Sequence, residues 1–98
     1  MLTGKQKRFL RGKAHHLKPI FQVGKIGVNE NMVKQIGEAL EKRELIKVSI
    51  LQNCLDDKHT IAEELSQGTG ALVVQIIGNN IVLYKESEDN KQIILPHA

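Results

Sequence analysis

Apolar and polar residues alternate along this chain in two periods, one typical of helices and one typical of strands. The first helical period covers residues 4–17, where the apolar side chains recur every three to four positions. Thr3 and Gln6 form a capping box at its start. Because the residue before a proline is disfavoured in the α conformation, Pro19 predicts where this helix ends.

Two more helices are expected, one after the N-cap residue Asn29 and one after Asp56 or Asp57 that ends near Gln67. Their buried stripes are expected to be Val33, Ile36 and Leu40 in the second helix, and Ile61, Ala62 and Leu65 in the third. The second helix should turn Lys34, Glu38, Glu41 and Lys42 to water. Gly37 costs this helix about 1 kcal/mol relative to alanine, which predicts a close contact between helix and sheet.

Alternation with a period of two predicts a strand at residues 45–51. The short apolar run 20–23 and the run 71–77, apolar on both faces apart from Gln75, predict two more, and residues 81–85 are expected to return antiparallel. Gly78-Asn79-Asn80 is expected to form a tight turn between the last two, and residues 92–95 a further short edge strand. Right-handed crossovers would place the second and third helices on one face of the sheet. The pattern therefore predicts one α/β domain over residues 1–98, in the order αβαβαββ, with helices packed on a mixed four-stranded sheet.

Composition narrows the class of protein. The chain is 41% apolar and 26% charged, which is typical of a globular domain and not of a disordered one. The longest mainly apolar run, 71–77, is too short to span a membrane, and the N-terminus has no apolar signal-peptide core. We therefore expect a cytoplasmic protein with no membrane partner. Cys54 is the single cysteine, which excludes an internal disulfide and a cysteine-based zinc site.

Charge is distributed unevenly along the chain. Residues 1–25 carry seven lysine and arginine side chains and no acidic one, whereas residues 26–98 carry seven basic and eleven acidic ones. At about 100° per residue, the polar side of the first helix gathers Lys7, Arg8, Arg11, His15 and Lys18. This cationic face suits a polyanion, because phosphate contacts supply most sequence-independent affinity for nucleic acids.

The stretch Gly24-Lys25-Ile26-Gly27 follows the first predicted strand and precedes the second helix. Glycines allow a backbone to approach a ligand closely, and N–H groups at the start of a helix attract anions. We therefore expect this loop to contact phosphates through its backbone and Lys25. An alternative for Ile26 is an apolar plug packed against the core.

Few residues support catalysis. Gly68-Thr69-Gly70 follows a helix and precedes a strand, the reverse of a dinucleotide-binding turn, and predicts a helix C-cap. Adjacent helical residues point about 100° apart, so His15-His16 is a poor metal pair. Asp56-Asp57 and Glu63-Glu64 are better suited to helix caps and solvated faces. We expect no enzyme, no cofactor and no small-molecule substrate.

RNA is the binding partner that the cationic face and the scarcity of aromatic residues favour. Phe9, Phe21 and Tyr84 are too few and scattered for a stacking platform, which favours recognition of shape and backbone in structured RNA. The alternative is a protein–protein adaptor whose basic face docks an acidic partner. A monomer is expected in either case.

Several separated motifs resemble one family. Lys5-Gln6, Leu10-Arg11, Ala14-His15, Leu17 and Pro19, followed by Val23-Gly24-Lys25 and Gly27, are similar to the start of a CRM domain (chloroplast RNA splicing and ribosome maturation) of the stand-alone bacterial YhbY type. Residues 44–48 are similar to its second strand, and Val74-Gln75, Ile77-Gly78 and Val82-Leu83-Tyr84 to its terminal hairpin. The resemblance covers residues 2–96.

The resemblance implies an RNA-binding α/β domain similar in shape to the C-terminal domain of translation initiation factor three. It implies association with ribosomal RNA in precursors of the large (50S) subunit, with the GxxG loop on RNA and Arg11, His15 and Lys18 beside that loop. Many members carry a basic residue after the hairpin glycine, where this chain has Asn79. The candidate RNA-binding residues are Gly24, Lys25, Ile26, Gly27, Lys5, Lys7, Arg8, Arg11, His15 and Lys18.

Overall fold

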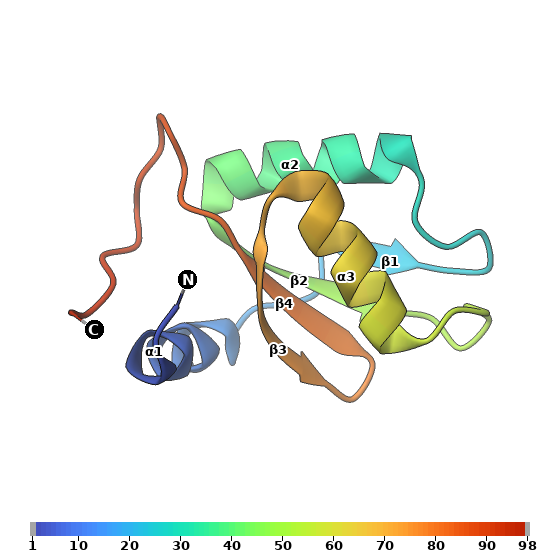
Figure 1. The fold of residues 1–98 in the computed structure, drawn as a ribbon, viewed down its shortest axis with the longest axis horizontal. Coiled ribbons are helices and arrows are strands. Elements are labelled where there is room, and N and C mark those ends of the chain that lie inside the picture. The colour runs from blue at the N-terminus through green and yellow to red at the C-terminus, as the bar shows by residue number, and fades with distance from the viewer. Residues whose placement is uncertain (1, 98) are drawn as a thin grey trace.

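A computed structural model describes residues 2–97. The elements are α1 (Gly4–Ala14), β1 (Phe21–Val23), α2 (Glu30–Arg43), β2 (Leu45–Ile50), α3 (Lys58–Thr69), β3 (Leu72–Ile77) and β4 (Asn80–Tyr84) (Figure 1). One sheet has the strand order β1-β2-β4-β3, with β1 parallel to β2 and the other pairs antiparallel. The predicted α/β class and the order αβαβαββ are confirmed. No helix within the described residues is both long and apolar enough to cross a membrane.

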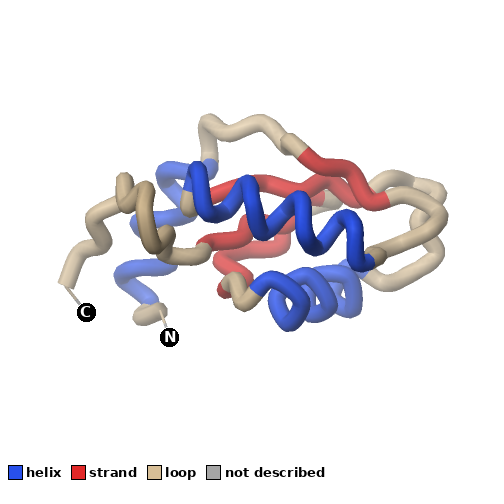
Figure 2. Tube along the Cα trace, turned by 90° about the horizontal axis from the view of Figure 1, so that it is seen from above, coloured by secondary structure: helices blue, strands red, loops and turns tan. Residues whose placement is uncertain are grey.

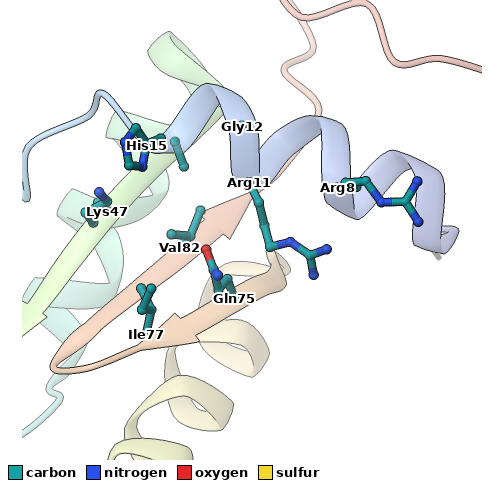
Figure 3. Close-up of a pocket in the computed structure, with 9 residues that line it drawn as sticks. Arg8, Arg11, Gly12, His15, Lys47, Gln75, Ile77 and Val82 are labelled. Atoms are coloured by element: carbon teal, nitrogen blue, oxygen red, sulfur yellow. The ribbon is translucent and has the colours of Figure 1, made fainter.

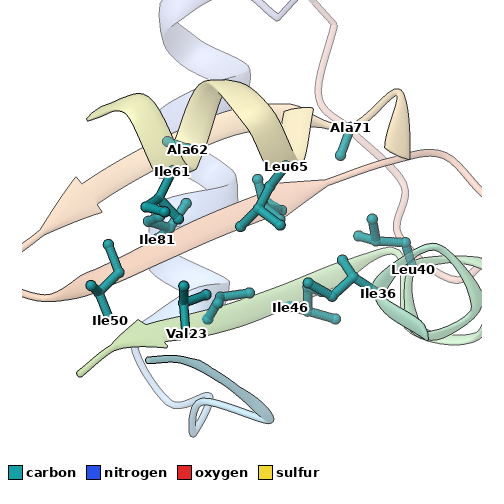
Figure 4. Packing of buried hydrophobic residues seen from close by; sticks show 12 residues of the cluster. Val23, Ile36, Leu40, Ile46, Ile50, Ile61, Ala62, Leu65, Ala71 and Ile81 are labelled. Carbon is teal, nitrogen blue, oxygen red and sulfur yellow. The ribbon is translucent and has the colours of Figure 1, made fainter. Parts of the chain in front are cut away.

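The sheet is covered on both faces. One face packs against α2 and α3. The larger core lies there and contains Ile36 and Leu40 of α2, Ile61 and Leu65 of α3, and apolar side chains of the strands (Figure 4). Figure 2 shows the helices against the sheet. The opposite face packs against α1 through a smaller cluster of buried residues, Leu10, Ala14, Leu45, Val74, Val82 and Tyr84. The crossover helices therefore share a face, as predicted, and α1 packs on the other one, where Ile93 and Leu95 also contact the smaller cluster.

Two local predictions about the first two helices are wrong. Helix α1 ends at Ala14 and not at residue 17, because the Leu17 N–H bonds back to the Ala14 carbonyl in a tighter turn before Pro19. A Cβ on Gly37 would meet no atom within 4 Å, so the expected close contact is absent there. The close approach is found at Gly68 of α3, where a Cβ would lie 3.0 Å from the methyl groups of Val33.

The end of α3 also differs from the prediction. The helix continues through Gly68 to Thr69, and the C-cap is Gly70 with a φ of 80°. At its start, Asp57 is the N-cap and accepts a hydrogen bond from the His59 N–H. The sequence alone did not decide whether Asp56 or Asp57 is the N-cap of this helix.

No strand forms at residues 92–95. Instead, the backbone N–H groups of Gln92 and Ile93 donate to one carboxylate oxygen of Glu44, at 2.6 and 2.8 Å, and the Ser87 N–H donates to the other at 2.8 Å. Glu44 is fully buried and has a φ of 64°. Burial raises the pKa of its carboxyl group, but these three donors and the nearby Lys91 outweigh it and the pKa is lowered overall.

Glu41 does not simply face water, as the sequence had suggested. Its carboxylate accepts hydrogen bonds from the Ser87 hydroxyl at 2.6 Å and from the backbone N–H groups of Glu88 and Asp89 at 3.0 Å. These donors lower the pKa of Glu41 to about 2. The two carboxylates at the end of α2 thus hold residues 87–93 against the domain without regular secondary structure.

Candidate nucleic-acid interface

The polar side of α1 borders a cleft against the sheet. Leu10 and Ala14 anchor the helix in the smaller core, and the spacing of Arg8, Arg11 and His15 places these three side chains along the cleft. The cleft has a volume of about 340 Å³ (Figure 3). Its remaining lining residues are Gly12 and Ala14 of α1, Lys47 of β2, Gln75 and Ile77 of β3, and Val82 of β4.

A β-bulge decides which face of the sheet Gln75 occupies. Val73 pairs with Leu83 and Gln75 pairs with Val82, so Val74 is an extra residue in β3. Val73 packs against the larger core, whereas Val74 belongs to the smaller core and Gln75 lines the cleft. Strict alternation from Val73 would have turned Gln75 toward α2 and α3, and the bulge turns it toward α1 instead.

A second hollow of about 180 Å³ shares one lining residue with the cleft. Lys18, Arg43 and Lys47 line it, and Lys47 lines both hollows. We call the set Arg8, Arg11, His15, Lys18, Arg43 and Lys47 the cationic strip. Across residues 2–97 one ion pair is formed, between Lys91 and Glu86 at 4.0 Å, so no carboxylate neutralises the strip.

The GxxG loop is a tight turn in which the Gly27 N–H donates to the Gly24 carbonyl at 3.0 Å. Gly27 has a φ of 79°, in a region that favours glycine. Because its N–H is bonded within the turn, that N–H is not free for a phosphate. Lys25 is exposed, and Ile26 is 86% exposed, so the alternative of a plug in the core is wrong. The tip of the turn presents one cation and one aliphatic side chain to solvent.

The loop is packed against the segment that precedes α3. A Cβ on Gly24 would lie 3.4 Å from the amide oxygen of Asn53, and one on Gly27 would lie 3.0 Å from a carboxylate oxygen of Asp56. An acidic side chain therefore flanks the turn.

The expectation that Arg11, His15 and Lys18 lie beside the GxxG loop is wrong. Two views across the long axis place the loop between β1 and α2 at one end of the molecule and α1 toward the other (Figures 1 and 2). No loop residue lines either hollow. The domain measures 39 × 26 × 22 Å. The ten candidate residues therefore form two separate sets, one on α1 with Lys18 and one in the loop.

Within the α1 set, the structure brings Arg8, Arg11 and His15 to the cleft and Lys18 to the adjoining hollow. Lys5 and Lys7 belong to α1 but line neither hollow. Sequence reasoning missed Arg43, Lys47 and Gln75. A signal existed for Lys47, because it alternates with the buried Ile46 and Val48 and must therefore point to the face that α1 covers.

Comparison with known proteins gives a consistent result. Residues 2–85 match the CRS1 / YhbY (CRM) domain. The chain is 73% identical over 96 residues to the probable RNA-binding protein YqeI of Bacillus subtilis, covering 98% of this chain and all of that protein. It is 43% identical to the probable RNA-binding protein MJ0652 of Methanocaldococcus jannaschii, covering 95% of this chain and 70% of the relative.

A solved structure agrees with the fold. The solution structure of SAV1595 from Staphylococcus aureus, a protein proposed to bind RNA, superposes with a TM-score of 0.82 at 61% identity. The match covers 98% of this chain and all of SAV1595.

Proposed function

Because the chain belongs to the CRS1 / YhbY (CRM) domain family, we propose that it is an RNA-binding protein that uses the cationic strip as its main contact with the RNA backbone. One observation carries this proposal. Five lysine and arginine side chains, together with His15, line two hollows that share Lys47, and none of the five is paired with a carboxylate within residues 2–97. Unpaired cations on a hollowed face are free to neutralise phosphates.

The exposed tip of the GxxG loop, at Lys25 and Ile26, is a second contact at the other end of the domain. Its contribution comes from the Lys25 ammonium group and from backbone at the tip, since the Gly27 N–H is already bonded within the turn. We assign the RNA to the precursor of the large ribosomal subunit, whose assembly the protein assists in the cytoplasm as a monomer. The family resemblance supports this finer assignment.

Titration of a structured RNA at several salt concentrations tests the electrostatic basis. If about five cations meet phosphates, the slope of log K against log[salt] is expected to be about −3 to −5. Lys47→Glu should weaken binding and flatten the slope. Lys34 is an exposed lysine on α2 that does not belong to the strip. Lys34→Glu makes the same charge change there and should have a much smaller effect on binding.

Co-sedimentation with ribosomal particles tests the cellular role. The tagged protein should travel with precursors of the large subunit and leave that fraction after RNase treatment. An association that survives loss of RNA would instead indicate an adaptor that docks an acidic protein. A salt slope near zero would remove the electrostatic premise in either case.

A further inference from the structure

The cleft beside α1 contains groups that binding of an RNA backbone does not require. Its floor is apolar, formed by the buried Ala14 and Val82 with the half-exposed Ile77 at the edge. The side-chain amide of Gln75 lies on the wall that faces Arg11 (Figure 3). A phosphate needs the cations and can also accept from an amide N–H, but it gains nothing from an apolar floor. A nucleobase needs all of them, because it has an apolar face that stacks on a guanidinium plane and a polar edge that an amide can pair with.

Gly12 keeps this cleft open. It lies inside α1, where glycine costs roughly 1 kcal/mol relative to alanine, and a Cβ at this position would meet no atom within 4 Å. Packing among residues 2–97 therefore gives no reason for glycine here. The missing side chain does leave the mouth of the cleft free, since Gly12 is one of its lining residues.

Gln75 is the second unusual residue. It is the one polar residue in β3, and the bulge at Val74 turns it into the cleft. Its amide forms no hydrogen bond with another group among the described residues and is only partly buried, so it is available to a ligand.

We propose that the cleft receives a single unpaired nucleotide of the bound RNA. The base lies on the apolar floor between Arg11 and Gln75, the Gln75 amide pairs with its polar edge, and Arg8 and Lys47 hold the neighbouring phosphates. A base inside a duplex cannot enter, because its polar edge is paired and its faces are stacked. The volume of about 340 Å³ is at the small end of ligand sites, as a single base requires. This inference rests on the proposed function and specifies the form of RNA recognised.

The test compares RNA hairpins with one stem sequence. One set carries a single bulged nucleotide, A, C, G or U in turn, and the reference carries an abasic residue at the same place, with the same phosphates and flexibility. Affinities are measured by fluorescence anisotropy at fixed salt. We expect the favoured bulged base to bind about tenfold or more tightly than the abasic reference, because base stacking contributes on this scale.

Gly12→Met fills the cleft and should abolish the preference for the base while leaving the affinity for the abasic RNA nearly unchanged. The fold should be kept or stabilised, since methionine is the better helix former and has open space. Gly37→Met makes the same change inside α2, also in open space, and should keep the preference. Gln75→Leu should reduce discrimination among the four bases without changing the salt slope.

The outcomes separate this inference from the proposed function. If all bulged RNAs bind as weakly as the abasic one, or if Gly12→Met keeps the preference, the nucleotide site is refuted while RNA binding stands. If the unaltered protein binds none of the hairpins, the proposed function itself fails.

Discussion

Glu44 offers the sharpest test of how this domain holds its C-terminal segment. Its side chain is fully buried and accepts three backbone N–H bonds from Ser87, Gln92 and Ile93. In Glu44→Gln the amide oxygen can still serve the two donors that share one carboxylate oxygen. The amide nitrogen would then face the Ser87 N–H, so that two donors oppose each other.

The expected cost follows from these bonds. A hydrogen bond to a charged group contributes about 1.5–3 kcal/mol, and a buried donor left without a partner costs about 1–3 kcal/mol. Glu44→Gln should therefore lower the free energy of unfolding by about 2–3 kcal/mol, which lowers Tm by roughly 10–20 °C for a domain of this size. Glu44→Ala removes all three acceptors and should cost about 3–5 kcal/mol, a large share of the total stability of such a domain.

Thermal and urea unfolding at pH 7 measure these values, with Glu38→Gln on the exposed side of α2 as the matched control. The control should stay within about ±0.5 kcal/mol. The pKa of Glu44 is lowered in the folded state, so its contribution is present above the ordinary glutamate pKa and is lost as the pH falls below it. The difference between the wild type and Glu44→Gln should shrink in acid. A Glu44→Gln protein that melts within 2 °C of the wild type at pH 7 would refute this account.

Three further predictions concern charge. Because the pKa of Glu41 is lowered from 4.5 to about 2 in the folded state, its stabilising effect should fade as the pH drops from about 5 to about 2, and Glu41→Gln should flatten that part of the stability curve measured by urea unfolding. Arg11→Lys should weaken RNA binding more than Lys7→Arg changes it, because a guanidinium binds phosphate bidentately and stacks on bases. Of these two residues, Arg11 lines the cleft and Lys7 does not. Equal affinities of the two variants in a titration would argue against both roles of Arg11. Lys25→Asp and Ile26→Asp should weaken RNA binding while melting within about 0.5 kcal/mol of the wild type, since both side chains are exposed, and full-strength binding by the double variant would remove the loop from the interface.

Local signals in the sequence were sufficient for most of the fold. The capping box of Thr3 and Gln6 and the N-cap Asn29 are both present in the structure, because caps act within one turn of helix. The strands were predictable from alternation in β2 and from the apolar runs of β3 and β4. The predicted strand at 92–95 failed because its N–H groups bond to Glu44, some 48 residues earlier in the chain, and no local pattern encodes such a contact.

The candidate site was only half predictable. Helical spacing placed Arg8, Arg11 and His15 together, and the structure gathers them at one cleft. The family resemblance implied that the GxxG loop lies beside Arg11, His15 and Lys18. Spacing along the chain could not correct this, because it gives no distance between a helix and a loop that follows the next strand. The bulge at Val74 also has no clear sequence signal, and without it Gln75 would be assigned to the opposite face.

If the protein binds RNA as proposed, the separation between the GxxG loop and the cationic strip makes this small domain a bivalent ligand. Once one end is bound, the second contact becomes intramolecular, and its effective concentration depends on whether the RNA can reach both ends of a rigid body 39 Å long. A folded RNA with phosphates at matching positions gains this avidity, and a short oligonucleotide that reaches one end gains none. Selectivity for a particular RNA architecture can thus arise from the spacing of two modest contacts, neither of which has to recognise a long sequence.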